Sequence, residues 1–153
     1  MTRAKNAALG YVEKMQNGKH GGFGYLSGNA PAGGTYSTMP GGGVLGLRMW
    51  GKENSSAVRR GAKYILENSK FDYGGTDSDL YAHYYESQAM MNRGGSEWKT
   101  YNAMFRDQLI GRQDAKGSWK PNGGKQLEEH YRNCLNILML EVYYRFLPTT
   151  GAK

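Results

Sequence analysis

A short connection between two helical segments is the feature that most constrains the fold. Residues 113–119 read Gln-Asp-Ala-Lys-Gly-Ser-Trp. Apolar and aromatic residues recur at steps of three and four on both sides, which predicts a helix before the run and another after it. Gly117 permits a sharp turn because glycine adopts positive φ without Cβ strain, and Trp119 is placed to cover a capping amide from Gln113. The run is interpreted first as the structural joint of a helical hairpin. The periodic residues are Trp98, Tyr101, Phe105, Leu109 and Arg112 before it, and Tyr131, Leu135, Leu138, Val142 and Phe146 after it.

Related joints occur earlier in the chain. Residues 11–25 and 64–75 each end a helical pattern and continue into a turn of glycines and aromatic residues. The first joint is one residue longer, because Phe23 follows Gln16 by seven residues whereas Trp119 follows Gln113 by six. Internal repeats of this kind organise helical arrays. We therefore predict three hairpins in an all-α fold, and their helices pair 2–16 with 38–50, 55–68 with 79–93, and 96–112 with 128–147.

Local signals refine these helices. Ser55, Asp79 and Ser96 stand where N-caps belong. Pro148 follows the last helix, which it cannot continue. Residues 41–43 are three consecutive glycines near the start of a predicted helix, where each costs about 1 kcal/mol relative to alanine. Tight helix packing is one explanation, and a flexible or strained first turn is the other.

The spacing Gln113-x-x-x-Gly117-x-Trp119 resembles the core of the QW repeat of squalene and oxidosqualene cyclases. The wider sequence is similar to the C-terminal region of large bacterial proteins with prenyltransferase/squalene-oxidase repeats, most clearly in residues 84–90, 94–98 and 140–148. The resemblance implies an α/α toroid, a ring of helical hairpins in which the second helix of each lines the inside. It covers most of residues 5–148, so we expect a toroid repeat domain at 1–148 and a tail at 149–153.

Three hairpins make about half of such a ring. An open arc of repeats exposes an apolar flank at each end, and repeat proteins normally cover these flanks. We therefore expect either missing repeats in a longer chain or self-association. A two-fold homodimer would supply six hairpins around a shared cavity.

Asp77 and Asp79 are the candidate catalytic acids. They resemble the acidic motif of class II terpene cyclases, but Leu80 stands where the family has a further aspartate. Protonation of an alkene needs an acid that its surroundings keep protonated. A pair just before a helix more often caps it and favours its dipole, which is the interpretation we prefer.

A zinc site is the second candidate, because protein prenyltransferase β subunits share the toroid and bind zinc through Asp, Cys and His. The Asp-x-Cys pair is missing, since Arg132 and Asn133 precede Cys134. His130 and Cys134 are four residues apart on one helical face, and His83 would be a third ligand. The preferred interpretation is a small apolar core cysteine and a histidine near a helix start, so no metal and no cofactor are expected.

The predicted inner helices carry a set of aromatic and polar side chains. On a toroid they would line the cavity, where aromatic walls suit carbocations, peptides, sugars or lipids. Interhelical packing with hydroxyls reaching water is the plainer interpretation for most of them. The candidate ligand-binding residues are Tyr81, His83, Tyr84, Gln88, Glu129, His130 and Tyr131.

Composition limits the class of protein. The chain has 153 residues, 39% hydrophobic and 22% charged, which is typical of a folded domain with a core. Its mean hydropathy is −0.72, and no apolar run reaches the roughly 20 residues of a membrane span. No signal peptide is visible, and the single cysteine leaves the compartment open. The net charge is +7, but the basic residues are scattered and no nucleic-acid motif accompanies them.

Three functions follow from the sequence. The first, which we favour, is a non-catalytic interaction module that binds protein, peptide or lipid within a longer protein. The second is a terpene-cyclase or prenyltransferase-type enzyme, or the remnant of one, that acts on a polyprenyl substrate. The third is a structural repeat block. The absence of the full acid and zinc motifs argues against the enzyme.

Overall fold

The described part of the chain is helical. A computed structural model describes residues 2–28, 38–75, 78–121 and 128–145, and within these ranges it contains helices and no β-strand. The prediction of an all-α fold is confirmed. The chain divides into two compact units, Met1–Ser69 and Lys70–Lys153. Each unit is described by itself, and the toroid arrangement stays a prediction.

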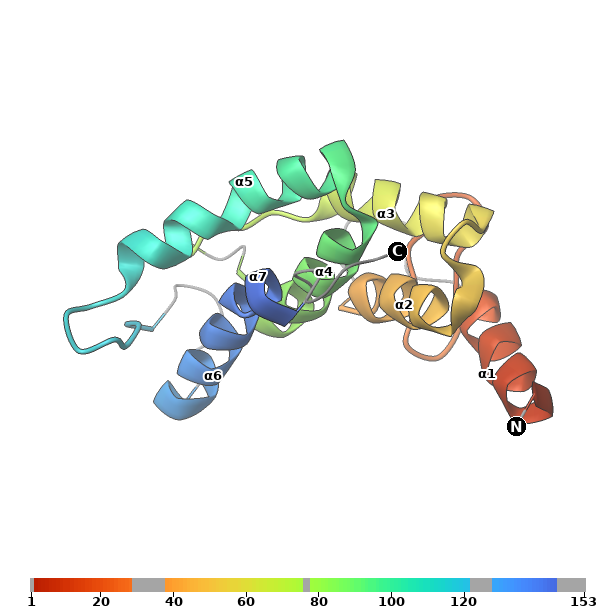
Figure 1. Cartoon of the computed structure of the whole chain (residues 1–153), viewed down its shortest axis with the longest axis horizontal. Coiled ribbons are helices and arrows are strands. Elements are labelled where there is room, and N and C mark those ends of the chain that lie inside the picture. Colours follow the sequence, from red (N-terminus) through yellow and green to blue (C-terminus); the bar gives the residue numbers. More distant parts are fainter. Residues whose placement is uncertain (1, 29–37, 76–77, 122–127, 146–153) are drawn as a thin grey trace, which may run out of the picture. The chain divides into compact units, whose positions relative to one another are not determined.

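The first unit packs two α-helices, α1 and α3, against α2. It contains α1 (Thr2–Lys14), α2 (Pro40–Leu47), a π-helical turn η1 (Arg48–Lys52) and α3 (Ser56–Asn68). Helix α2 contacts both α1 and α3 (Figure 1). The apolar stripe of α3, spaced at three and four residues, turns toward this core because burying it removes apolar surface from water. The core residues include Leu9, Phe23, Val44, Leu47, Val58, Ala62 and Ile65.

The second unit is built around α4. It contains α4 (Leu80–Arg93), α5 (Gly95–Arg112), α6 (Glu129–Leu140) and the short α7 (Val142–Arg145). Helix α4 contacts α5, α6 and α7 (Figure 1). All six long helices predicted from the sequence are therefore present, although the last is divided at Glu141 into α6 and α7. The core residues include Phe71, Tyr73, Leu80, Met90, Tyr101, Phe105, Leu109, Trp119, Leu135 and Met139.

Two of the three predicted N-caps are confirmed. The side chain of Ser55 accepts a hydrogen bond from the Val58 N–H at 3.2 Å, and Asp79 accepts one from the Ala82 N–H at the same distance. The prediction for Ser96 is wrong, because α5 begins at Gly95 with Gly94 at its N-cap. Gly94 has φ +70°, so the chain turns from α4 into α5 two residues earlier than a serine cap at position 96 would require.

Tight packing explains one of the glycines near the start of α2. A Cβ on Gly43 would lie 2.5 Å from the ring of Phe23, which is closer than two such atoms approach. A Cβ on Gly42 or Gly46 would meet nothing within 4 Å. Gly43 therefore lets the Phe23 ring reach the α2 backbone. Gly42 and Gly46 are not needed for this contact.

Joint 1 (residues 16–23) and joint 3 (residues 113–119) have the same construction. In each, the glutamine pairs with the aromatic residue in an isolated β-bridge, Gln16 with Phe23 and Gln113 with Trp119. The glutamine Nε2 donates to a glycine carbonyl within the turn, that of Gly21 at 2.9 Å or Gly117 at 3.0 Å. These glycines have φ +83° and +81°. The extra residue of joint 1 is accommodated inside the turn without changing these bonds.

Trp119 is the buried centre of joint 3. Its side chain is 1% exposed, and its indole N–H donates to the Leu109 carbonyl of α5 at 2.8 Å. Its backbone N–H donates to the Asn133 side chain of α6 at 3.0 Å. One residue therefore connects the end of one helix to the start of the next. The expectation that it covers the Gln113 amide is wrong, because the Gln113 side chain is exposed.

Joint 2 (residues 71–75) lacks the glutamine and receives one from elsewhere. Gln108 of α5 donates to the Phe71 carbonyl at 2.6 Å and accepts from the Tyr73 N–H at 3.1 Å. The Tyr73 hydroxyl donates to the Lys120 carbonyl and accepts from Asn136. The Gln108 amide thus forms hydrogen bonds with the Phe71 carbonyl and the Tyr73 N–H, which form no β-bridge within the described residues.

Candidate functional site

Helix α4 holds most of the site residues predicted from the sequence. Some of them lie in the buried core and others on the surface. Asp79 caps the helix, so this candidate acid accepts a backbone hydrogen bond. Its partner Asp77 lies outside the described residues. Positions 80, 83, 86, 87 and 90 are buried, whereas Tyr81, Tyr84 and Tyr85 are at least partly exposed. The period of 3.6 residues thus separates a buried polar network from a surface of tyrosines.

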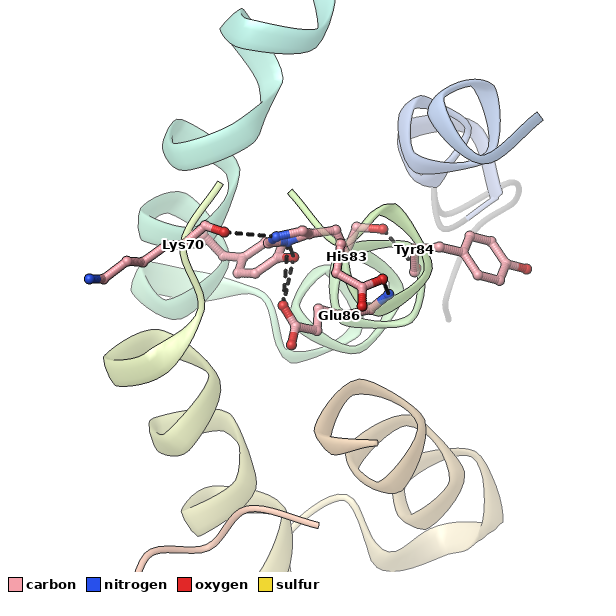
Figure 2. A network of polar contacts seen from close by, with 8 residues as sticks. Lys70, His83, Tyr84 and Glu86 are labelled. Carbon is pink, nitrogen blue, oxygen red and sulfur yellow. Dashed lines mark hydrogen bonds and ion pairs between the residues drawn. The ribbon is translucent and has the colours of Figure 1, made fainter. Parts of the chain in front are cut away.

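The buried network is centred on His83. Its ring Nδ1 lies 2.7 Å from the Tyr101 hydroxyl of α5, and its Nε2 lies 3.0 Å from the Lys70 carbonyl oxygen (Figure 2). The edge of the Phe71 ring packs against the imidazole, with 4.8 Å between centroids. His83 is 2% exposed, and both ring nitrogens are engaged. Its imidazole lies in the interior rather than on a wall open to a ligand.

Glu86 completes the network. Its carboxyl Oε2 lies 3.0 Å from the Tyr101 hydroxyl and 3.5 Å from His83 Nδ1, and the side chain is fully buried. Burial raises the pKa of Glu86 well above its usual value. The same effect lowers the pKa of His83 from 6.5 to about 4. Both shifts arise because a buried site disfavours the charged form of each group.

The hydrogen-bond partners limit where the protons of this network lie. The Lys70 carbonyl oxygen can only accept a hydrogen bond, so Nε2 of the neutral imidazole carries the proton and Nδ1 accepts. The Tyr101 hydroxyl has one proton and lies within hydrogen-bond distance of both Nδ1 and Glu86 Oε2, so both contacts are satisfied together when the Glu86 carboxyl is neutral and supplies the second proton. This order gives each contact one donor and one acceptor without placing an ion in the core, where desolvation is costly.

A second group of side chains forms what we call the tyrosine patch: Tyr81, Tyr84 and Tyr85 of α4 with Tyr131 of α6. The rings of Tyr81 and Tyr85 meet edge to face at 5.2 Å, and those of Tyr84 and Tyr85 at 4.8 Å. The pKa of Tyr85 is raised, mainly by a hydrogen bond with Tyr81 and to a lesser extent by burial. Nearby Tyr131 adds a smaller contribution in the same direction. Tyr81 is 40% exposed and Tyr131 41%. In Figure 2 the Tyr84 ring points away from the polar network.

Three of the predicted ligand-binding residues therefore lie in the tyrosine patch: Tyr81, Tyr84 and Tyr131. Gln88 is buried, and its amide lies 3.4 Å from the Tyr84 carbonyl. Glu129 is exposed, and its carboxylate accepts a hydrogen bond from the hydroxyl of Ser118 in joint 3 at 3.1 Å. His130 is exposed on the first turn of α6.

Sequence reasoning missed three residues that the structure brings into these groups. Tyr85 is the centre of the tyrosine patch, and its spacing of four from Tyr81 was the signal that would have identified it. Tyr101 and Glu86 form the buried network with His83. The spacing of three between His83 and Glu86 places them on one face of α4, but nothing in the sequence identifies Tyr101 of α5 as their partner.

The candidate zinc ligands are in different surroundings. His83 is buried with both nitrogens engaged, whereas His130 and Cys134 are exposed on α6. The interpretation of Cys134 as a core residue is wrong, because the α6 stripe that faces the core is formed by Arg132, Leu135, Asn136 and Met139. Within the described ranges, no three His, Cys, Asp or Glu side chains are grouped as a metal site would need.

The chain was compared with known protein families, curated proteins and solved structures, and no match was found. Of the helices in the described residues, none combines the length and the apolar character needed to cross a bilayer.

Proposed function

We propose that this chain is a non-catalytic repeat module of the α/α-toroid type that binds a segment of another protein or a peptide through its tyrosine patch. The observation that carries the proposal is the division of α4. Its titratable side chains, Asp79, His83 and Glu86, are engaged in capping and in the buried network. The adjoining surface consists of partly exposed tyrosines.

Tyrosine suits this role for physical reasons. Each ring offers a large apolar face with few rotatable bonds, so ordering it on binding costs little entropy, and its hydroxyl both donates and accepts hydrogen bonds. Edge-to-face contacts between Tyr81, Tyr85 and Tyr84 further restrict the rings. A preorganised aromatic surface of this kind supports binding to the backbone and apolar side chains of a peptide.

The alternative function, an enzyme that acts on a polyprenyl substrate, needs an acid or a metal that reaches the substrate. Asp79 is placed at the start of α4, where a backbone N–H holds its carboxylate. Glu86 has the raised pKa that such an acid requires, but it is fully buried against Tyr101. Neither arrangement favours the enzyme over the binding module.

A displayed peptide library selected against the purified chain tests the proposal. We expect selected peptides to bind with an affinity that falls at least about tenfold in Tyr81→Ala/Tyr131→Ala, because aromatic anchors carry most of the energy of such contacts. Tyr25→Ala is the matched control, since Tyr25 is 76% exposed and lies in the other unit. Equal affinity in the double variant would contradict the proposal. Binding only to lipid vesicles, or turnover of squalene or a prenyl diphosphate, would replace it with one of the alternatives.

A further inference from the structure

Joint 1 is covered by α3, the first helix of the next hairpin, and Gln16 makes the connection. Gln16 Nε2 donates to the Ala57 carbonyl of α3 at 2.8 Å, and Gln16 Oε1 accepts from the Arg60 guanidinium at 2.9 Å. The α3 backbone lies so close that a Cβ on Gly21 would meet the Arg60 carbonyl at 2.6 Å. A Cβ on Gly22 would meet the Tyr64 ring at 2.8 Å. Gln16 is 9% exposed as a result.

Joint 2 is covered in an equivalent manner by α5. There the amide comes from the helix rather than from the joint, because Gln108 bonds to the backbone of Phe71 and Tyr73. A Cβ on Gly74 would lie 2.8 Å from the Arg112 guanidinium of the same helix. In two joints, then, a glutamine amide connects the turn to the first helix of the next hairpin.

Joint 3 has the same construction but is not covered in this way within the described residues. Gln113 is exposed, and a Cβ on Gly117 would meet only the amide of Gln113 at 3.8 Å. Ser118, which stands where joint 1 has Gly22, is partly exposed. Joint 3 therefore keeps the amide that would bond to a helix and leaves open the side that α3 occupies in joint 1. It differs at Ser118, whose Cβ would displace a ring placed like that of Tyr64.

The sequence of α1 matches the face that α3 uses. That face has the spacing i, i+3, i+4, i+7, in residues Ala57, Arg60, Gly61 and Tyr64, and α1 carries Ala4, Ala7, Ala8 and Tyr11 at the same spacing and in the same register. The first of these positions is alanine in both helices. The third is Gly61 in α3, where a Cβ would lie 2.5 Å from Val44 and 3.0 Å from Phe23, and Ala8 in α1, so the two faces differ there by one methyl group. The α1 face is available, because Ala4, Ala7 and Tyr11 are exposed while Leu9 turns into the core.

We propose that joint 3 of one copy of this chain binds the Ala4–Tyr11 face of α1 of a second copy, head to tail, with the Gln113 amide donating to the Ala4 carbonyl as Gln16 does to Ala57. Each copy has one joint 3 and one α1 face, so the same contact can repeat from copy to copy and cover both surfaces. Ala7 stands where α3 has Arg60, so the bond to the amide oxygen is absent, and we expect reversible association at micromolar concentration. The inference does not rest on the tyrosine patch as a binding site.

Three arginine substitutions along α1 test the contact with equal changes of charge. Ala4→Arg places a long side chain where α3 has the buried Ala57, so we expect association at least about tenfold weaker. Ala7→Arg restores the guanidinium that bonds to the amide oxygen, so we expect about threefold to tenfold tighter association. Asn6→Arg is the control, because Asn6 lies on the opposite face of the helix and association should not change. Identical effects of all three would show that charge alone acts, which would overturn the proposal.

A mixing experiment tests the head-to-tail geometry. Light scattering of the unmodified chain should give at least about twice the 17.0 kDa chain mass, and Ala4→Arg and Gln113→Arg should each give the monomer mass. A mixture of the two should regain dimers, because the intact joint 3 of the first variant meets the intact α1 of the second. Both substitutions are at exposed positions, and thermal unfolding of each variant checks that it remains folded. A monomeric unmodified chain, or a mixture that remains monomeric, would overturn the proposal.

Discussion

Gln16 and Gln113 are the same residue at equivalent positions of two joints, and their surroundings give them different roles. Both amides donate to a glycine carbonyl in the turn. Within the described residues, Gln16 alone of the two also bonds to a neighbouring helix, through the Ala57 carbonyl and the Arg60 guanidinium. We therefore expect Gln16→Ala to lower the free energy of unfolding by about 2–3 kcal/mol, because it leaves buried partners unsatisfied, and Gln113→Ala by about 0.5–1 kcal/mol. Urea unfolding of both variants measures the difference, and equal losses would contradict it.

Trp119 is the residue on which joint 3 depends. Its indole is almost fully buried and bonded to the Leu109 carbonyl. Trp119→Ala should cost about 3–5 kcal/mol, as large-to-small substitutions of buried aromatic residues do. Trp50→Ala is the matched control, because Trp50 is 46% exposed and should change the thermal midpoint little. An unchanged midpoint for Trp119→Ala would mean that joint 3 contributes nothing to stability.

Glu86 makes stability depend on pH in a defined direction. Its folded pKa is raised above 4.5, so its contribution to stability is complete below pH 4.5 and is lost as pH rises toward the folded value. His83 acts in the opposite sense. Its pKa falls from 6.5 to about 4, so its contribution is complete above pH 6.5 and is lost as pH falls toward 4.

The Glu86→Gln variant isolates the first of these effects. A glutamine amide can donate to the Tyr101 oxygen as the neutral carboxyl does, but it does not titrate. The stability of the variant minus that of the unmodified chain should therefore rise as the pH increases above 4.5, the usual pKa of the carboxyl. Thermal midpoints across this range measure it. A stability difference that does not change with pH would show that the pKa of Glu86 is the same in the folded and unfolded states.

At the scale of elements, α2 shows how packing decides whether replacing a glycine with alanine stabilises or destabilises the protein. Gly43 and Gly46 lie in the same helix, but only Gly43 faces an aromatic ring at a distance that excludes a Cβ. We expect Gly46→Ala to stabilise the protein by up to about 1 kcal/mol, through helix propensity. Gly43→Ala should destabilise it by about 1–3 kcal/mol, through overpacking against Phe23. Differential scanning calorimetry distinguishes the two, and a shift of the same sign for both would contradict the packing argument.

The helices themselves follow from local signals. The caps at Ser55 and Asp79 were predictable because each side chain reaches a backbone N–H three residues later in the chain. The start of α5 was not predictable in this way, because Gly94 supplies a turn geometry that competes with a serine cap two residues later. The periodicity of α4 predicted a helix but left open which of its polar residues lie inside, since that depends on where α5 places Tyr101.

At the scale of the whole molecule, the expected chemistry is that of a binding protein. His130 and Cys134 are exposed on one face of α6, and His83 is engaged in the core. We expect the purified chain to hold less than one zinc per chain after dialysis, because two exposed ligands without a third bind the metal weakly. Metal analysis by mass spectrometry measures this, with Cys134→Ser as the control. One tightly held zinc per chain, lost in that variant, would favour the prenyltransferase-type alternative.

The sequence by itself determined the features that depend on neighbours along the chain. These are the positions of the six long helices, the turns at glycines 21 and 117, and the shared spacing of a glutamine, a glycine and an aromatic residue in joints 1 and 3. Only the tertiary structure decided that Gln16 is buried and Gln113 exposed, that His83 and Glu86 share a proton network with Tyr101, and that Gly43 is needed where Gly46 is not. The physical reason is the same in each case. Caps and turns are determined within a few residues, whereas burial, pKa and steric fit depend on which distant side chain comes to lie opposite.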